Sequence, residues 1–463
     1  MIGRKPMNDF VTIVGGGLAG SEAAWQAARL GVRVRLHEMR PTVRTPAHRT
    51  PYLAELVCSN SFKSEELSNA HGLLKEEMRR FGSLILGAAE PARVPAGAAL
   101  AVDRDRFAAG VTAAIESEPL IEVIRDEVRE IPPEGPAILA TGPLVAPALY
   151  EAIGEFTGRE HLYFYDAISP VVEADSIDRS IVYAASRYGK GSGEDYLNCP
   201  LSEPEYDPFY QALRGAAKAD LHDFERDRFF EGCLPIEEMA LRGRDTLRFG
   251  PMKPVGLPDP RTGREPFAVV QLRQDNLAAD HYSMVGLQNQ LKFGEQVRIF
   301  RMIPGLASAQ FVRLGMIHRN SYICAPTVLR PTYQTRSRDD LFFAGQVSGV
   351  EGYLESAASG MLAGMNAARL VCGSQPLAPP PETALGALCR YISAADSEDY
   401  QPTNISFGLL PPLEAPPRGR KEKRAELVRR ALTHFDLWLS QLSLQPAGDG
   451  VSRAGFLPSF PAE

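Results

Sequence analysis

The sequence predicts an α/β fold, in which a Rossmann-like dinucleotide-binding domain is interrupted by an inserted mixed α/β domain and followed by a helical C-terminal segment. Three observations predict it. A glycine-rich turn joins a short apolar strand to an Ala-rich helix near the N-terminus. Two later apolar strands also end in glycine. The long region between those two strands has mixed strands, turns and Pro-rich connections.

The N-terminal βαβ unit carries the clearest pattern. Residues 11–14 form a β-branched run, residues 21–30 an Ala-rich helix, and residues 32–37 a second strand. The G-x-G-x-x-G turn between them permits a tight bend, then a close approach to a pyrophosphate, then close helix–strand packing. The helix N-terminus faces the phosphates, and an acid after the second strand can accept from ribose hydroxyls. The cofactor-binding residues predicted here are Gly15, Gly16, Gly17, Leu18, Ala19, Gly20 and Glu38.

Two later segments favour FAD as the dinucleotide. Residues 136–142 form an apolar strand ending in Ala-Thr-Gly, which resembles the strand that returns to the cofactor sheet in two-dinucleotide-type flavoproteins. Residues 340–345 form another strand and precede a small-residue helix at 355–370, which resembles the C-terminal flavin motif of those proteins. Three such segments favour an FAD-binding domain over three unrelated strands that happen to end in glycine. They add Gly142, Gly345, Gln346, Gly352 and Tyr353 to the predicted cofactor-binding residues.

These segments divide the chain into four parts. The first part of the FAD-binding domain is expected at 1–180 and its closing part at 318–374, with the inserted domain at 181–317 between them. Residues 375–463 are expected to form a linker and a helical C-terminal segment, because a Pro-rich run at 375–381 separates them from the rest.

Composition narrows the class of protein. The chain has 463 residues and a formal net charge of −7, which argues against a uniformly basic nucleic-acid coat. Its six cysteines are too few for a disulfide scaffold, and no Cys/His cluster has metal-ligand spacing, so no metal is expected. The first ten residues lack an apolar signal region, and no stretch is apolar enough to span a membrane. The expectation is a soluble cytoplasmic protein without a membrane partner.

Two cysteines lie in unusual surroundings. Cys58 follows an apolar run and precedes Ser-Asn-Ser-Phe-Lys, so Lys63 could lower the thiol pKa if it folds back. Cys233 lies between Gly232 and Pro235, a context that suggests an exposed bend. Taken singly, each thiol fits the ordinary role of a small buried hydrophobe better than a reactive role.

Two basic runs could contact RNA. Residues 242–254 interleave arginines with Phe, Gly and Pro, which suits phosphate contacts and stacking on an unstacked base. Residues 418–430 hold seven Lys or Arg against two Glu, in a pattern that fits a helix with one charged face. A solvated surface explains either run equally well.

Several stretches together resemble one family, the folate- and FAD-dependent tRNA (uracil-5-)methyltransferases. The match runs from about residue 11 to 370. Its most selective pieces are the two cysteine motifs and the run Leu-Arg-Phe-Gly-Pro-Met-Lys-Pro. The segments that carry the resemblance are 14–23, 56–61, 231–237, 246–257, 300–306, 318–320 and 345–353.

The resemblance implies a particular chemistry. A thiolate, implied to be Cys233, adds to C6 of uracil so that C5 attacks a one-carbon unit. Methylenetetrahydrofolate donates this unit through the flavin of FAD, NADPH or NADH reduces the flavin, and Cys58 takes the C5 proton. The implied substrate is the T-loop uridine at position 54 of the tRNA T-arm, which must leave its stack. Since the two thiols can titrate together, their roles are interchangeable on sequence grounds. Tyr353 either stacks on the flavin or the folate pterin, or packs under the last helix.

Three rival readings remain. The flavin- and folate-dependent enzyme that modifies the wobble uridine shares the first βαβ unit, but it is expected to be well over 463 residues long. A flavin-dependent NAD(P)H oxidoreductase acting on a small molecule needs neither cysteine motif. A non-catalytic RNA-binding flavoprotein would be indifferent to loss of either cysteine.

Overall fold

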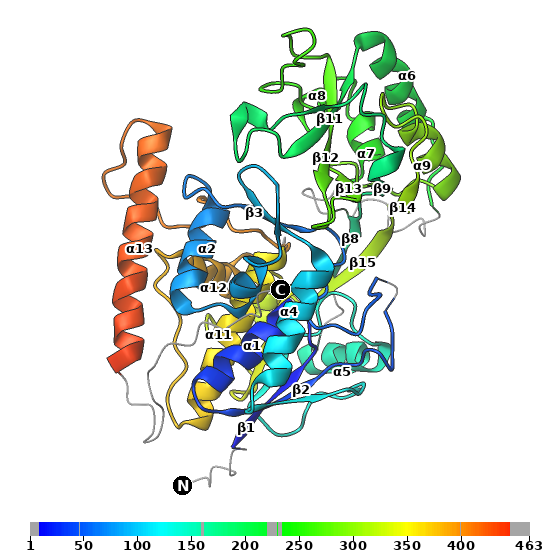
Figure 1. Ribbon diagram of the computed structural model, residues 1–463. Coiled ribbons are helices and arrows are strands. Elements are labelled where there is room, and N and C mark those ends of the chain that lie inside the picture. The colour runs from blue at the N-terminus through cyan, green and yellow to red at the C-terminus, as the bar shows by residue number, and fades with distance from the viewer. Residues whose placement is uncertain are drawn as a thin grey trace.

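A parallel five-stranded sheet forms the centre of the larger domain, in the strand order β16-β7-β1-β2-β6 (Figure 1). The computed structural model describes residues 9–45, 47–158, 162–219, 229, 234–398 and 400–444. The sheet brings together segments that are more than 300 residues apart, because β16 pairs with β7 and β7 with β1. Its strands are β1 (Phe10–Val14), β2 (Arg33–His37), β6 (Ile121–Ile124), β7 (Ala137–Leu139) and β16 (Leu341–Phe343). The predicted Rossmann-like arrangement of the three glycine-ended strands is confirmed.

Two helices from opposite ends of this domain pack closely, namely α1 (Leu18–Arg29) and α11 (Tyr353–Val371). A Cβ added at Gly360 would lie 2.0 Å from the Ala19 carbonyl oxygen, and one at Gly364 would lie 2.3 Å from that of Ala23. Only glycine therefore fits at these two positions. The apolar, small-residue composition of both helices is explained by this contact, which buries nearly every residue of α1.

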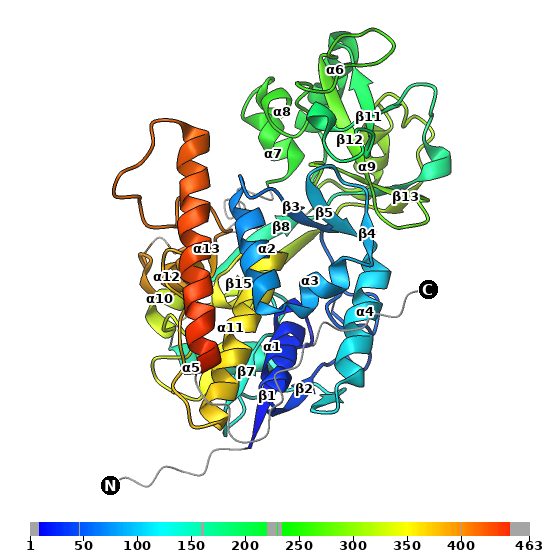
Figure 2. The ribbon, with the colours of Figure 1, turned by 60° about the vertical axis from the view of Figure 1, so that its left-hand side comes forward.

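Further helices surround the sheet and carry the C-terminal segment. The long helix α13 (Arg420–Leu444) lies beside α2 (Ala70–Phe81), and Arg80 Nη1 pairs with Asp436 at 2.7 Å (Figure 2). A small antiparallel sheet, in the order β3-β5-β4, stands above α2 and α4. The remaining elements of this domain are β3 (Ser61–Ser64), β4 (Arg93–Val94), β5 (Ala99–Val102), α3 (Leu84–Ala89), α4 (Arg104–Ser117), α5 (Pro147–Thr157), α10 (Ala325–Val328) and α12 (Ala384–Ala394).

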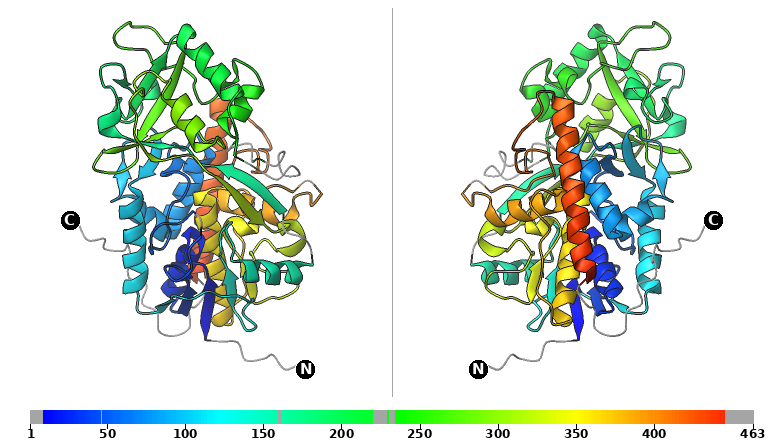
Figure 3. Two further views of the ribbon diagram at one scale, coloured as in Figure 1. Left: turned by 90° about the vertical axis from the view of Figure 1, so that its right-hand side faces the viewer. Right: turned by 90° about the vertical axis from the view of Figure 1, so that its left-hand side faces the viewer.

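The inserted domain has its own sheet and its own hydrophobic core. Six antiparallel strands follow the order β10-β11-β12-β13-β9-β14, and the domain lies at one end of the molecule (Figure 3). Its strands are β9 (Val171–Glu173), β10 (Tyr183–Ala184), β11 (Tyr196–Leu201), β12 (Ala268–Gln274), β13 (His281–Met284) and β14 (Phe311–Arg313). Its helices are α6 (Glu203–Arg214), α7 (Ile236–Leu241), α8 (Thr246–Phe249) and α9 (Phe293–Phe300).

A two-stranded antiparallel ribbon, β8 (Leu162–Ala167) with β15 (Ile317–Tyr322), joins the two domains. The expected start of the insertion at 181 needs correction, since β9 already pairs with β13 and β14 in the second sheet. We place the start just after β8. The sequence could not show this, because β9 is three residues long and its partners lie more than a hundred residues later.

In the described part of the chain, no helix is both long enough and apolar enough to cross a membrane.

Candidate functional site

The turn after β1 has the backbone geometry that its glycines suggest. Gly15 has a φ of +102°, and a Cβ there would lie 2.5 Å from the Ala140 carbonyl oxygen of the neighbouring strand. A Cβ at Gly20 would lie 1.8 Å from the Gly15 carbonyl oxygen, so this glycine permits close helix–strand packing. At Gly17, by contrast, a Cβ would meet nothing within 4 Å. The turn is therefore tightly packed on the protein side and open at Gly17.

A cavity lies at this open side, at the carboxyl ends of the parallel strands. Such an edge is where α/β sheets bind their ligands. Most of the predicted cofactor-binding residues line it, and Gly16, Gly20 and Gly352 are the exceptions. The predicted residues in the lining are Gly15, Gly17, Leu18, Ala19, Glu38, Gly142, Gly345, Gln346 and Tyr353. The sequence did not single out other lining residues, among them His37, Arg40, Glu55, Asp126 and Thr141.

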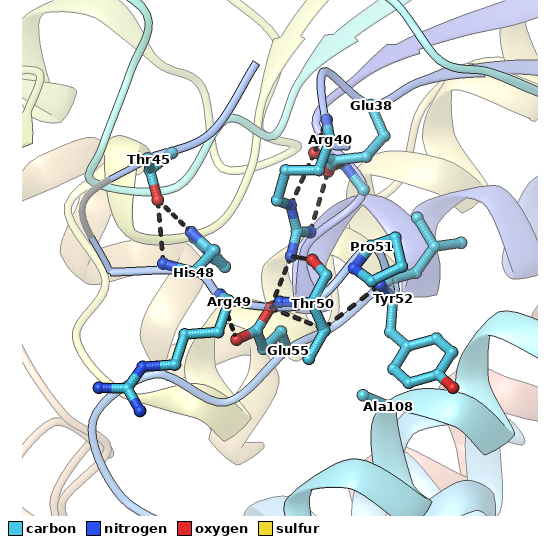
Figure 4. A network of polar contacts seen from close by, with 12 residues as sticks. Glu38, Arg40, Thr45, His48, Arg49, Thr50, Pro51, Tyr52, Glu55 and Ala108 are labelled. Carbon is cyan, nitrogen blue, oxygen red and sulfur yellow. Dashed lines mark hydrogen bonds and ion pairs between the residues drawn. The ribbon is translucent and has the colours of Figure 1, made fainter. Parts of the chain in front are cut away.

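Glu38 is more fully engaged than the sequence suggested (Figure 4). Its Oε2 accepts from the Gly16 N–H at 2.9 Å and from Arg40 Nη2 at 3.2 Å. Its Oε1 accepts from the Arg40 N–H at 3.0 Å and from Arg40 Nε at 2.9 Å. Burial alone would raise the pKa of Glu38, but the hydrogen bonds and charge of Arg40 lower it below its usual value. Glu38 therefore holds the glycine turn and Arg40 in place, and it also lines the cavity at which the sequence predicts a ribose contact.

Arg40 extends this network to the loop that follows β2. Its Nη1 donates to Glu55 Oε2 at 3.0 Å, and Glu55 also accepts from the Thr50 N–H at 3.0 Å and the Arg49 N–H at 2.8 Å. Figure 4 shows Arg40 between the two carboxylates, with Glu38 on one side and Glu55 on the other. Glu38 precedes Arg40 by two residues and Glu55 follows it by fifteen. This spacing matches no sequence motif, so the pairing could not be predicted.

The cavity fits a dinucleotide in two respects. The N-terminus of α1 opens onto it with no side-chain cap, so its N–H groups are available to an anion. The hydroxyl of Thr141 is buried in the lining and has no hydrogen-bond partner among the described residues, so it too calls for a polar ligand.

The flavin-type segment after β16 places a further carboxyl group next to a residue of the cavity lining. Gly345 has a φ of +78°, and Gln346 Nε2 donates to Glu351 Oε2 at 2.6 Å. Burial, and then the charge of Asp166, raises the pKa of Glu351 to about 8. Glu351 was not singled out from the sequence, although it lies within the same glycine-rich motif.

Tyr353 connects the cavity to the Cys58 loop. Its ring lies beside that of Phe62, with centroids 5.9 Å apart, and its hydroxyl accepts from the N–H groups of Cys58 and Ser59. On the carbonyl side, Arg313 Nη1 donates to the Val57 oxygen at 3.1 Å and Nη2 to the Cys58 oxygen at 3.3 Å. The loop is thus held between α11 of the larger domain and β14 of the inserted domain.

The charges around Cys58 differ from those expected. Burial and the charge of Asp166 raise the thiol pKa, and Arg104 and Arg313 lower it in part. The sequence allows Lys63 to lower the thiol pKa if its side chain folds back towards Cys58. Its Nζ instead donates to Asn404 Oδ1 at 2.8 Å, so the side chain is directed towards a loop in the C-terminal part of the chain.

The second predicted cysteine, Cys233, lies outside the described residues. The end of its motif is described: Glu237 on α7 accepts from the Gln290 N–H at 2.8 Å. Burial raises the pKa of Glu237 to about 7.

The basic run at 242–254 is only partly available to a ligand. Arg244 pairs with Asp207 and Glu203, at 2.6 and 2.8 Å. Arg248 pairs with Asp245 at 2.7 Å and lies over the Phe267 ring. Phe249, in contrast, is 80% exposed. The second basic run begins α13 as expected, and five of its cations are exposed, namely Arg418, Arg420, Lys421, Lys423 and Arg429.

Comparison with known proteins identifies the family of the chain. Residues 10–375 match the family described as glucose inhibited division protein A. GidA of Aquifex aeolicus, in its form II crystal, has the same fold with a TM-score of 0.67 and 18% identity, covering 94% of this chain and 75% of that one. Two proteins named methylenetetrahydrofolate--tRNA-(uracil-5-)-methyltransferase TrmFO, from Moorella thermoacetica and Geobacter sulfurreducens, are each 58% identical over 434 residues. Each alignment covers 94% of this chain, with 98% and 100% of the respective relative. The chain therefore belongs to the glucose inhibited division protein A family and, within it, to the TrmFO methyltransferases.

Proposed function

We propose that the chain methylates C5 of a uridine in tRNA, with methylenetetrahydrofolate as one-carbon donor, FAD as cofactor and NADPH or NADH as reductant. One observation carries this proposal: relatives that bear this activity in their name are 58% identical over almost the whole of both chains. The site supports it, because Tyr353 both lines the cavity suited to a dinucleotide and contacts the Cys58 loop.

The residues that would hold FAD are those that line the cavity. Gly17 and the N-terminus of α1 suit the pyrophosphate, and the buried Thr141 hydroxyl offers a further polar contact. Gly345 and Gln346 would lie beside the flavin end. When bound, the reduced flavin supplies the hydride and carries the one-carbon unit.

The cysteines would perform the chemistry on the base. Cys233 would add its thiolate to C6 of uracil, which makes C5 nucleophilic, and Cys58 would accept the proton that C5 loses. Tyr353 and Arg313 hold the backbone of Cys58 from both sides, so the loop is fixed before the substrate arrives. The reverse assignment of the two thiols uses the same residues.

The finer assignments extend the same proposal. The target would be the T-loop uridine at position 54, which leaves its stack to enter the site, and the T-arm would be the part of tRNA that is bound. The enzyme would act in the cytoplasm, where folate, reduced nicotinamide and tRNA are all present.

The test is an incubation of the purified yellow protein with unmodified tRNA, NADPH and radiolabelled methylenetetrahydrofolate, followed by nucleoside analysis. Label in 5-methyluridine of the T-loop, lost in Cys233→Ala, would support the reaction and the role of Cys233. Label at the wobble uridine would favour the wobble-modifying enzyme. Flavin oxidation without labelled RNA would favour the small-molecule oxidoreductase.

A further inference from the structure

The guanidinium of Arg313 lies against the Cys58 peptide. Arg313 ends β14 of the inserted domain, and its two terminal nitrogens donate to the consecutive carbonyl oxygens of Val57 and Cys58. The N–H of Cys58 is held from the other side by Tyr353. The backbone of this one residue is therefore fixed by side chains from two domains.

Arg313 belongs to a cluster of three arginines. Arg273 donates to Ser59 Oγ at 2.9 Å and to Asn60 Oδ1 at 2.8 Å, so it holds the next two residues of the same loop. Arg104, at the start of α4, pairs with Asp275 Oδ1 at 3.0 Å. Among the described residues, Asp275 is the acid that this cluster pairs with directly.

Two donors of this cluster are left over. Arg104 Nε and Arg313 Nε are both buried, and neither has a hydrogen-bond partner in the described part of the chain. A buried donor without an acceptor is unfavourable, so these two donors indicate that the arginine cluster accommodates an anion.

We propose that Arg313 is a positioning residue that orients Cys58 and, together with Arg104, stabilises its thiolate. This inference rests on the proposed function in one respect, namely that Cys58 takes part in the reaction. The Sγ–H bond of Cys58 breaks and its proton passes to solvent. The thiolate later takes the C5 proton of the uracil and becomes a thiol again.

The charged groups around Cys58 have opposite effects on the ionisation of its thiol. Asp166 on β8 and Glu351 ahead of α11 oppose ionisation of the thiol, and burial opposes it more strongly than either. Arg104 on α4 and Arg313 on β14 favour it. Tyr353 is uncharged, because burial raises the pKa of its hydroxyl and the hydroxyl keeps its proton. Burial likewise lowers the pKa of Arg313, to about 10, so the guanidinium is charged at neutral pH. Removal of the two arginines would leave the effects of Asp166 and Glu351 without this opposition.

The experiment measures thiolate formation at Cys58 directly. The holoenzyme is treated with iodoacetamide between pH 7 and 10, and the alkylated Cys58 peptide is quantified by mass spectrometry. Arg313→Gln is expected to lower the alkylation rate at Cys58 about tenfold between pH 7 and 9, where Arg313 is charged, and this corresponds to one pKa unit. Arg313→Lys keeps the charge and should recover most of the rate.

The matched control is Arg301→Gln, because Arg301 also donates twice to a backbone carbonyl of the inserted domain, that of Ala309, but away from Cys58. It should leave the rate unchanged. If Arg313→Gln does not fold, as judged by circular dichroism and flavin content, Arg104→Gln takes its place with the same expected decrease. An unchanged rate in the folded arginine variant, or an equal decrease in Arg301→Gln, would overturn the inference. The assay needs neither tRNA nor folate, so a wild-type protein that fails to methylate tRNA refutes the proposed function separately.

Discussion

The hydroxyl of Tyr353 accepts two backbone hydrogen bonds, from the N–H of Cys58 at 2.8 Å and from that of Ser59 at 3.0 Å. Tyr353 is also the first residue of α11 and lines the cavity suited to the dinucleotide. A single side chain therefore fixes the position of the cysteine loop relative to the cofactor site.

Tyr353→Phe should loosen this loop. The variant leaves two N–H groups without their acceptor, which costs roughly 1–3 kcal/mol for each group that stays buried. We expect a lower denaturation midpoint and a loss of methyl transfer larger than the loss of bound flavin, both measured on one preparation. Tyr391→Phe, which removes a hydroxyl bonded to the Gln401 carbonyl oxygen, is the control. Equal activity in the two variants would contradict this role.

Arg40→Gln should weaken flavin binding. Removal of its charge leaves Glu38 and Glu55 without their shared cation, and the pKa of Glu38 then rises because burial is no longer opposed. The glycine turn, which depends on Glu38 through the Gly16 N–H, should lose its fixed geometry. We expect at least a tenfold rise in the flavin dissociation constant, measured by fluorescence, on the order of 1.4 kcal/mol.

The control for this change lies on the preceding strand. Arg35 on β2 is exposed, lies over the Phe10 ring and pairs with Glu122 at 3.6 Å. Arg35→Gln should retain flavin as the wild type does. If Arg40→Gln also retains it, the network in Figure 4 serves only the folding of the loop.

Glu77 should make stability fall as pH rises. Its carboxylate accepts from the Ala384 and Leu385 N–H groups at the start of α12, and burial raises its pKa to about 8. The folded carboxyl keeps its proton up to that pH, whereas the unfolded one releases it near pH ~4.3. The unfolding free energy should therefore decrease by about 1.4 kcal/mol per pH unit between roughly pH 5 and 8.

Urea denaturation at several pH values checks this. Glu77→Gln lacks the titration and should show a flatter dependence over the same range. Glu76→Gln removes the partly exposed neighbour, which pairs with Arg80, and should keep the wild-type slope. Parallel curves for all three proteins would show that Glu77 does not titrate in this window.

Phe249→Ala should weaken tRNA binding if this exposed ring stacks on an unpaired base. Stacking of a base on an aromatic ring contributes roughly 1–3 kcal/mol, so the dissociation constant should rise about 5- to 160-fold. Because Arg244 and Arg248 are already paired within the protein, the ring rather than these arginines is expected to carry the contact. Phe293→Ala, a ring 57% exposed at the start of α9, is the control. A dissociation constant unchanged by Phe249→Ala would assign this surface to solvent.

Sequence patterns predict the elements whose signals lie within one short stretch of the chain. The strand, turn and helix from β1 to β2 follow from a β-branched run, the glycine spacing and the Ala-rich helix, and the structure confirms them within a few residues. The start of the inserted domain could not be predicted, because β9 acquires its partners only when the chain returns at β13 and β14.

The candidate site shows the same division. Glycines were found because each has a backbone reason that the spacing reveals. Arg40, Arg104 and Arg313 were not found, since their importance comes from partners brought in by tertiary contacts with Glu55, Asp275 and the Cys58 loop. A charged residue in a sequence does not reveal which buried carbonyl or carboxylate it will meet.

The ribbon of β8 and β15 makes the inserted domain a detachable module. Ala167 and Ile317 are register partners, so the chain leaves and re-enters the larger domain at adjacent points. A short hairpin turn could replace residues 168–316 without moving either strand. The truncated protein would keep its cavity and the Tyr353 contact and lose Arg273 and Arg313. It should still turn yellow with flavin, while the carbonyl groups of its cysteine loop lose their arginine partner. Cofactor binding therefore depends on the larger domain alone, whereas the conformation of the cysteine loop depends on the inserted domain as well.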